Sequence, residues 1–297
     1  MCARGQHLLA MQKNGLTVTH PEFRFSGEVV AVSLDEFFRC WSPTRLDLIL
    51  LCTKSEATDS VGRQLAHWFS GGGVCVPVLS LQNGVDNERR LACNIEPGAV
   101  LGGLAVRIGA RVSEPGCIEA VGIAQLIVGA WPNQRDAAAG PAVDCLDEIV
   151  DVMRSAGIEV QRTENILREL WRKLVINNGV NPLSALTGMD SRQLTSSTDT
   201  SWMVRTLMEE TARAAAADGI ILGTDDVDEM FELISSFDAI KTSMLIDREA
   251  GRSMEVNDIC GAVISRSDAL DLESPYTRMI ASLLTAIERA DTFAASR

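Results

Sequence analysis

A continuous apolar run, LDLILLCTK at residues 46–54, constrains the fold of this chain more than any other stretch. Its length and polar ending are typical of a parallel β-strand that is buried on both faces. A helix at residues 55–69, ended by the glycines at 71–73, and a second buried strand at 74–81 follow it. Thr53 and Lys54 stand at the carboxyl end of the first strand, where open α/β sheets place their ligand contacts.

Shorter elements surround these two strands. Before them we predict a helix at residues 7–13, closed by Asn14 and Gly15, and strands at 16–20 and 28–32. After them, we expect a helix at 85–93, a strand at 100–106, antiparallel strands within 107–128, a helix at 142–156 and a strand at 158–161. Pro77 conflicts with the middle of the second strand, because proline removes a donor from the ladder.

The second half of the chain has a different pattern. Residues 165–178, 201–218, 227–237 and 254–270 carry helical spacing, as in Val256, Ile259, Val263 and Ile264. The sequence therefore predicts two domains, an α/β domain at 1–163 and an all-helical domain at 164–297. A cleft between two such domains is a common place for a small-molecule site.

Composition excludes several classes of function. The net charge of -13 argues against nucleic acid or an anionic membrane as a partner, because neutralising phosphates needs a basic surface. Eight cysteines stand singly, with three histidines and no C-x-x-C pair, so we expect reduced thiols and no metal site. No apolar run approaches the ~20 residues of a membrane span. A soluble cytoplasmic protein is the expectation.

One segment of the helical half, WRKLVINNGVNP at residues 171–182, has an unusual set of polar residues. If it is helical up to its closing proline, Lys173, Asn177 and Asn181 fall at i, i+4 and i+8 on one face. An ammonium and two amides in a row can hydrogen-bond an oxygen-rich ligand. The alternative is a capped surface helix with a solvated lysine.

Three long segments together resemble the ketopantoate reductase family: SLQNGVDNERRL (80–91), ELWRKLVINNGVNPLSALTG (169–188) and TSMLIDREAGRSMEVNDICGAVI (242–264). Members of this family are NADPH-dependent 2-dehydropantoate 2-reductases of pantothenate biosynthesis. The resemblance implies a Rossmann-like NADP-binding domain at 1–163. It also implies a helical substrate and dimerisation domain at 164–297, similar to the C-terminal domain of 6-phosphogluconate dehydrogenases.

The resemblance assigns catalytic and substrate-binding roles within the helical half. Lys173 corresponds to the general acid, which donates a proton as hydride transfer leaves negative charge on the ketone oxygen. Asn177 and Asn181 correspond to the paired asparagines that bind the substrate oxygens, although they would merely cap a helix end if the helix stopped before Pro182.

Two further residues of the helical half match the family. Glu255, in M-E-V-N, corresponds to an acidic residue that holds the substrate hydroxyl or the lysine; otherwise it is a first-turn carboxylate favoured by the helix dipole. Ser243 corresponds to a serine that contacts the substrate carboxylate; otherwise its hydroxyl bonds to its own helix backbone.

The cofactor residues implied by the resemblance lie in the first half. Asn83 corresponds to an asparagine beside both nicotinamide and substrate, Lys54 to a lysine near the cofactor, and Arg4 to the arginine that recognises the 2′-phosphate of NADP. As alternatives, Asn83-Gly84 is an ordinary turn and Lys54 a solvated loop residue.

The sequence departs from the family at its beginning. The family opens with a strand, a G-x-G-x-x-G turn and a helix that hold the cofactor pyrophosphate, and no such turn stands near the start here. The register of Arg4 implies that a unit of roughly 30 residues is missing upstream, through a misplaced start or a genuine shortening. We then expect weak NADPH binding, and an exposed sheet edge at residues 46–53 that favours aggregation or swapping.

Two other functions compete with reduction of 2-dehydropantoate. The first is reduction of another small 2-keto or 3-keto acid, as in the hydroxyisobutyrate or 6-phosphogluconate dehydrogenase class, whose members lack N-G-V-N-P and M-E-V-N in this arrangement. The second is a non-catalytic protein that uses its helical domain for association or ligand sensing. A homodimer is plausible because helices such as residues 201–218 are apolar.

Overall fold

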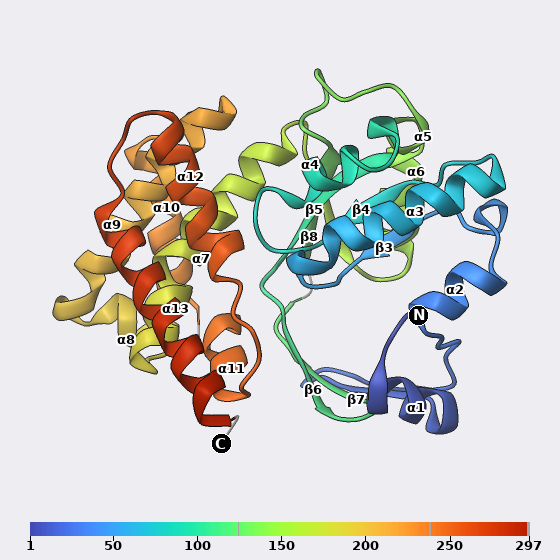
Figure 1. The fold of residues 1–297 in the computed structure, drawn as a ribbon, viewed down its shortest axis with the longest axis horizontal. Helices are drawn as coiled ribbons and strands as arrows, with labels where there is room; N and C mark the ends of the chain where they lie inside the picture. Colours follow the sequence, from blue (N-terminus) through green and yellow to red (C-terminus); the bar gives the residue numbers. More distant parts are fainter. Residues whose placement is uncertain (124, 238, 296–297) are drawn as a thin grey trace.

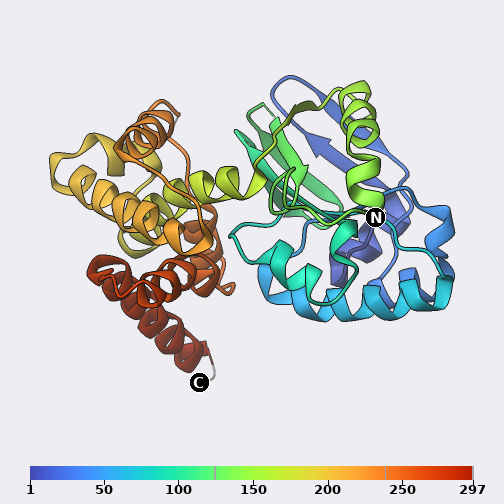
Figure 2. The ribbon, with the colours of Figure 1, turned by 90° about the horizontal axis from the view of Figure 1, so that it is seen from above.

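The computed structural model describes residues 1–123, 125–237 and 239–295. An α/β half contains the described strands and is followed by a helical half, as Figures 1 and 2 show. This is the expected fold class. Helix α7 (Ile166–Thr187) begins against strands of the first half and runs into the second, so it links the two.

The larger sheet has five strands in the order β3-β4-β5-β8-β9. These are β3 (Ile49–Leu51), β4 (Val78–Ser80), β5 (Val100–Val106), β8 (Gln125–Ala130) and β9 (Glu159–Arg162). The first three are parallel, β8 runs antiparallel to β5, and β9 pairs in parallel with β8.

Helices cover both faces of this sheet. Successive residues of a strand point to opposite faces, so Val78 packs with α3 (Thr58–Gly72) and α4 (Asn87–Ala92). The next residue, Leu79, packs with α6 (Leu146–Ser155) on the other face. Because β3 and β4 are neighbouring parallel strands, their carboxyl ends lie at the same edge of the sheet.

A smaller sheet of four strands lies beside the first, in the order β2-β1-β7-β6. It consists of β1 (Leu16–Thr19), β2 (Arg24–Gly27), β6 (Gly109–Glu114) and β7 (Cys117–Val121), with α1 (Gly5–Asn14) packed against it. The predicted strand at 28–32 is wrong. The turn after Thr19 pairs that residue with Arg24, so the hairpin partner ends at Gly27 and Val32 keeps only an isolated bridge to Cys2.

Strand β3 differs from the sequence prediction. It has three residues, stands at the edge of the sheet, and leaves Leu50 50% exposed, so burial on both faces is wrong. An apolar run encodes hydrophobicity but not the number of neighbours that cover it. The exposed edge expected at residues 46–53 is present. The conflict at Pro77 disappears, because β4 begins one residue later.

The helical half is built around α7. Its neighbours are α8 (Ser191–Ser196), α9 (Thr198–Ala214), α10 (Thr224–Ser235), α11 (Ser243–Glu249), the π-helical turn η5 (Asn257–Gly261), α12 (Ala262–Ala269) and α13 (Pro275–Ala295). Trp171 and Leu174 of α7 are fully buried. Gly179 lets α9 approach closely, because a Cβ there would lie 2.7 Å from Met208 Cγ.

Helix α7 does not end near Asn178 or at Pro182, as the sequence suggested. It continues through the proline to Thr187, and Gly188 ends it in the left-handed conformation, with φ of +79°. Proline deprives the helix of one N–H donor, a loss that packing in the helical core offsets. Among the described residues, no helix is both long and apolar enough to cross a membrane.

We expect Leu50→Lys to reduce self-association of the 297-residue chain, because a charge on an exposed edge strand opposes strand pairing. Leu50 is half exposed, so the free energy of unfolding should change by less than about 0.5 kcal/mol. Light scattering during a concentration series measures the first effect and urea denaturation the second. Leu79→Lys, at a fully buried position of β4, is the control and should unfold the domain. Unchanged scattering by Leu50→Lys would exclude the edge as the associating surface.

Candidate active site

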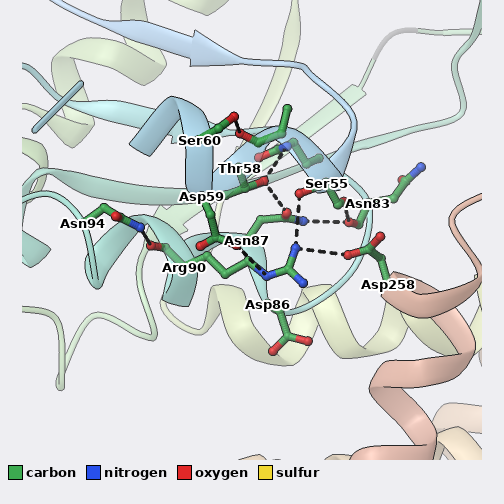
Figure 3. Close-up of polar contacts among 12 residues, drawn as sticks. Ser55, Thr58, Asp59, Ser60, Asn83, Asp86, Asn87, Arg90, Asn94 and Asp258 are labelled. Atoms are coloured by element: carbon green, nitrogen blue, oxygen red, sulfur yellow. Dashed lines mark hydrogen bonds and ion pairs between the residues drawn. The ribbon is translucent and has the colours of Figure 1, made fainter. Parts of the chain in front are cut away.

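Polar groups gather where β3 and β4 end, facing the helical half. Ser55 Oγ donates to the Asn83 carbonyl at 2.9 Å, and Asn87 Nδ2 donates to the same oxygen at 2.7 Å. Thr58 Oγ1 donates to Asn87 Oδ1 at 2.9 Å and accepts from Gln82 Nε2 at 2.9 Å (Figure 3). This network fixes the backbone of Asn83 and leaves its side chain free to point at the second half.

Asn83 connects the two halves. Its Nδ2 donates to Glu255 Oε2, a residue 172 positions away, at 3.3 Å. Gly84 has φ of +100°, and a Cβ there would lie 3.2 Å from the Asp258 carbonyl, so the turn needs glycine. Arg90 Nη1 donates to the Ser55 carbonyl and to Asp258 Oδ1, both at 3.2 Å, as Figure 3 shows.

A second connection involves Lys54. Its Nζ donates to Asp247 Oδ2 at 2.8 Å and to the Ser253 carbonyl at 2.6 Å. Asp247 is buried and also accepts from Arg252 Nε at 2.8 Å. Lys54 is therefore not a freely solvated loop residue, because it ties the end of β3 to the segment that precedes Glu255.

A buried arginine forms the third connection. Arg266 of α12 donates to both carboxyl oxygens of Asp86, at 2.9 and 2.5 Å, and to Asp218 Oδ2 at 3.2 Å. Trp171 Nε1 also donates to Asp218, at 3.2 Å. Burial raises the pKa of Asp86, but its hydrogen bonds and charge interaction with Arg266 outweigh burial and lower the pKa below its ordinary value.

Lys173 of α7 lies within range of a charge interaction with Glu255, the partner of Asn83, and with Glu88. Burial lowers the pKa of its ammonium to about 8, against the opposing influence of Glu255 and then Glu88. Within the described ranges, Nζ has no hydrogen bond or ion pair to a protein group. A partly buried amine that keeps its donors uncommitted and titrates near neutral pH is suited to proton transfer.

Two carboxyls of the helical half face the end of β4. Burial raises the pKa of Glu255, although the hydrogen bond from Asn83 opposes the shift. Burial also raises the pKa of Asp258, against the charge of Arg90. Asp258 lies within the π-helical turn η5 and Glu255 shortly before it, and such a distortion is frequent at functional sites.

The other candidates for substrate binding are Asn177, Asn181 and Ser243. Asn177 and Asn181 share the Lys173 face of α7, and neither amide has a hydrogen-bond partner in the described part of the chain. Because α7 continues past both residues, they do not cap its end. Ser243 is exposed at the first position of α11, whose cap is instead Thr242, accepting from Leu245 N.

The cofactor residues fit their group only in part. Asn83 and Lys54 stand at the carboxyl ends of β4 and β3, which suits the nicotinamide end of a dinucleotide. Arg4 is exposed just before α1 and contacts none of the other candidates in the described residues. Among the described residues next to β3, no glycine-rich turn leads into a helix, so this arrangement for holding a pyrophosphate is not seen there.

Sequence reasoning missed several residues of this centre. Ser55, Thr58, Asn87, Arg90 and Asp258 fix the loops, and no role was predicted for any of them. Three of these residues lie inside the segments 80–91 and 242–264, so the segments themselves contained the signal. Their contacts join residues far apart in sequence, which local spacing does not encode.

Comparison with protein families gives two matches that together span most of the chain. Residues 1–133 match the family described as ketopantoate reductase PanE/ApbA. Residues 165–288 match its C-terminal counterpart, ketopantoate reductase PanE/ApbA C terminal. The catalytic candidates of α7 and η5 lie within the second match.

Individual relatives agree with the family matches. The chain is 29% identical over 239 residues to a 2-dehydropantoate 2-reductase of Pyrococcus abyssi (strain GE5 / Orsay), covering 80% of this chain and 75% of the relative. A PanE/ApbA family ketopantoate reductase of Ralstonia eutropha JMP134 superposes with a TM-score of 0.81 at 25% identity, covering 98% and 90%. D-mandelate dehydrogenase, solved with NADH and anilino(oxo)acetate, has a TM-score of 0.83 at 20% identity over 97% and 89%, a likeness of fold.

Arg266→Ala should destabilise the protein by about 3 kcal/mol, because it leaves Asp86 and the buried Asp218 without their shared cation. Urea denaturation measures this loss. Arg278→Ala is the matched control: its ion pair with Asp268 is half exposed, so its removal should lower the free energy of unfolding by less than about 1 kcal/mol. Equal losses in the two variants would contradict a special role for the buried cluster.

Proposed function

The chain belongs to the ketopantoate reductase family, whose members are oxidoreductases acting on CH–OH groups, and we propose that it reduces 2-dehydropantoate to pantoate with NADPH. One observation carries the proposal: Lys173, with a pKa of about 8 and no hydrogen bond to any described residue, interacts with the charge of Glu255, which the Asn83 amide contacts. Hydride transfer to a ketone needs a proton donor of this kind at the developing alkoxide.

The reaction is completed by one proton from the protein. When bound, reduced nicotinamide would supply the hydride that the ketone carbon accepts. In the proposed mechanism, Lys173 donates a proton from Nζ to the ketone oxygen, which becomes the hydroxyl of pantoate, and the resulting neutral amine regains a proton before the next cycle. Burial supports this role, since an ordinary lysine holds its proton too tightly for transfer near pH 7.

Neighbouring side chains would orient the substrate. We assign Asn177 and Asn181 to the substrate oxygens, because both amides are uncommitted and share the Lys173 face of α7. Ser243 is assigned to the substrate carboxylate. Glu255 would accept from the substrate hydroxyl or from Lys173, and Asn83 would contact both nicotinamide and substrate.

The cofactor proposal rests on the same family membership. D-mandelate dehydrogenase, which shares the fold, was solved with NADH, and we propose that this chain also uses a nicotinamide dinucleotide. NADP rather than NAD is proposed because Arg4 corresponds to the arginine that recognises the 2′-phosphate. Lys54 would contact the cofactor after releasing Asp247. The homodimer and the cytoplasmic location expected from the sequence stay predictions.

Lys173→Met should lower kcat for ketopantoate reduction by about 100- to 10,000-fold, because it removes the proton donor and keeps an unbranched side chain. NADPH oxidation followed by absorbance, at millimolar NADPH, measures the change. Lys241→Met, which removes an exposed ammonium, is the control and should keep the wild-type rate. Activity of the wild-type enzyme on another 2-keto acid alone would redirect the substrate assignment while leaving Lys173 in place.

The pH profile provides a second test of Lys173. The general acid must be protonated, and its pKa is about 8, so kcat/KM should be constant below pH 8 and fall tenfold per pH unit above it. The same assay in buffers of constant ionic strength gives the profile. A rate that stays constant to pH 10 would exclude this ammonium as the proton donor.

We expect the 297-residue chain to bind NADPH weakly, because the described residues next to β3 contain no glycine turn for the pyrophosphate. Fluorescence titration should give a dissociation constant well above the ~1 μM low end of typical KM values. Calorimetry with ketopantoate is the companion measurement, since the substrate residues of α7 are present. Tight NADPH binding would show that other groups replace the phosphate cradle.

A further inference from the structure

Glu88 is a buried carboxyl that the mechanism above does not use. It is the second residue of α4 and is 0% exposed, and neither of its carboxyl oxygens accepts a hydrogen bond in the part of the chain the structure describes. The Ser80 hydroxyl lies close to it without reaching hydrogen-bond geometry. Burying a carboxyl without a partner is unfavourable, so its retention calls for a physical reason.

The side chain of Glu88 enters the space between β5 and the start of α7. A Cβ on Gly102 of β5 would lie 3.6 Å from Glu88 Cγ and 2.8 Å from Ile166 Cγ1. Gly102 therefore makes room for both neighbours. Ile166 and Lys173 are seven residues apart, two turns of one helix, and share a face of α7. The Glu88 carboxyl lies on the side of α7 from which Lys173 projects.

Charge interactions link the two residues in both directions. Burial raises the pKa of Glu88 to about 7, against the influence of its own backbone N–H and of the nearby Ser80 hydroxyl; Asp86 adds to the rise, and the Lys173 ammonium opposes it. In turn, Glu255 and Glu88 are the carboxyls that oppose the lowering of the pKa of Lys173 by burial. The charge of Lys173 therefore interacts with one carboxyl from each half of the molecule.

The other acidic groups around the site have partners of their own. Glu255 accepts from Asn83, Asp258 pairs with Arg90, and Asp86 pairs with Arg266. Of the two other buried acids named in the described core, Glu210 accepts from the start of α13 and Asp247 pairs with Lys54. In this set, Glu88 is the acid whose oxygens accept no hydrogen bond among the described residues, and with Glu255 it is one of two carboxyls whose charge acts on Lys173.

We propose that Glu88 is a positioning residue for the reaction: its buried carboxyl, placed beside the start of α7, acts through Lys173 by favouring the charged form of that amine. The inference rests on the proposed function for its catalytic meaning, but the electrostatic link between the residues does not. Burial raises the pKa of Glu88 and lowers that of Lys173, so the two groups titrate as a coupled pair.

The direct test measures the protonation of Lys173 without any substrate. The chain has four lysines, so trace acetylation with acetic anhydride across a pH series, read by peptide mass spectrometry, reports each amine separately. Exposed Lys13 serves as the internal reference. We expect Glu88→Gln to lower the midpoint of Lys173 labelling by about one pH unit, because an opposing charge is lost. An unchanged midpoint would overturn the proposal.

Two further variants separate electrostatics from a loss of shape. Glu88→Asp keeps the charge and should restore at least half of the shift, whereas a midpoint equal to that of Glu88→Gln would overturn the proposal. Glu148→Gln makes the same chemical change at an exposed position of α6 and should leave the midpoint unchanged. Circular dichroism melts establish that each variant is folded, and Glu88→Asp carries the test if Glu88→Gln is not.

Kinetics then distinguish this inference from the proposed function. In the Glu88→Gln enzyme, the fall of kcat/KM at high pH should begin about one pH unit lower, with KM at low pH unchanged. If Glu88→Gln shifts the labelling midpoint but the wild type does not reduce ketopantoate, the proposed substrate is refuted and the Glu88–Lys173 link stands. If the wild type reduces ketopantoate but Glu88→Gln has the wild-type labelling midpoint, the proposed function stands and the Glu88–Lys173 link is refuted.

Discussion

The site depends on one buried ion pair. Arg266 of α12 holds Asp86, which begins the turn into α4, and the same guanidinium binds Asp218 beneath Trp171 of α7. The three partners belong to both halves of the molecule, so their geometry sets the distance between the end of β4 and the Lys173 face of α7. Because Arg266 is almost fully buried, a relative movement of the halves would separate charges in a poorly solvating environment.

The packing of the two halves also determines the charge interactions of Lys173. Burial takes the Lys173 ammonium out of water and lowers its pKa, and two carboxyls, Glu255 and Glu88, limit the shift. Such a balance keeps an amine protonated near neutral pH and still able to release a proton. In the proposed reaction, this combination would supply the proton that the ketone oxygen needs.

Much of the fold and part of the site were predictable. The change from strand pattern to helical pattern in mid-chain indicated an α/β half followed by a helical half, and the structure confirms that fold class. Errors occurred where long-range packing outweighs local pattern: β3 is a short edge strand, and α7 passes through Pro182 because the surrounding core stabilises it. The roles assigned to the candidate residues all stay predictions, and Ser243 and Arg4 are in addition exposed and outside the central network.

The sequence by itself determined the order of elements and the alignment of Lys173, Asn177 and Asn181, because helical spacing is a local property of the chain. Only the tertiary structure decided which groups face that row. Asn83 donates a hydrogen bond to Glu255, 172 residues away, and Gly102 leaves room for both Glu88 and Ile166 of α7. Contacts of this kind, and the pKa values they produce, depend on how two separately encoded halves pack, for which local periodicity contains no information.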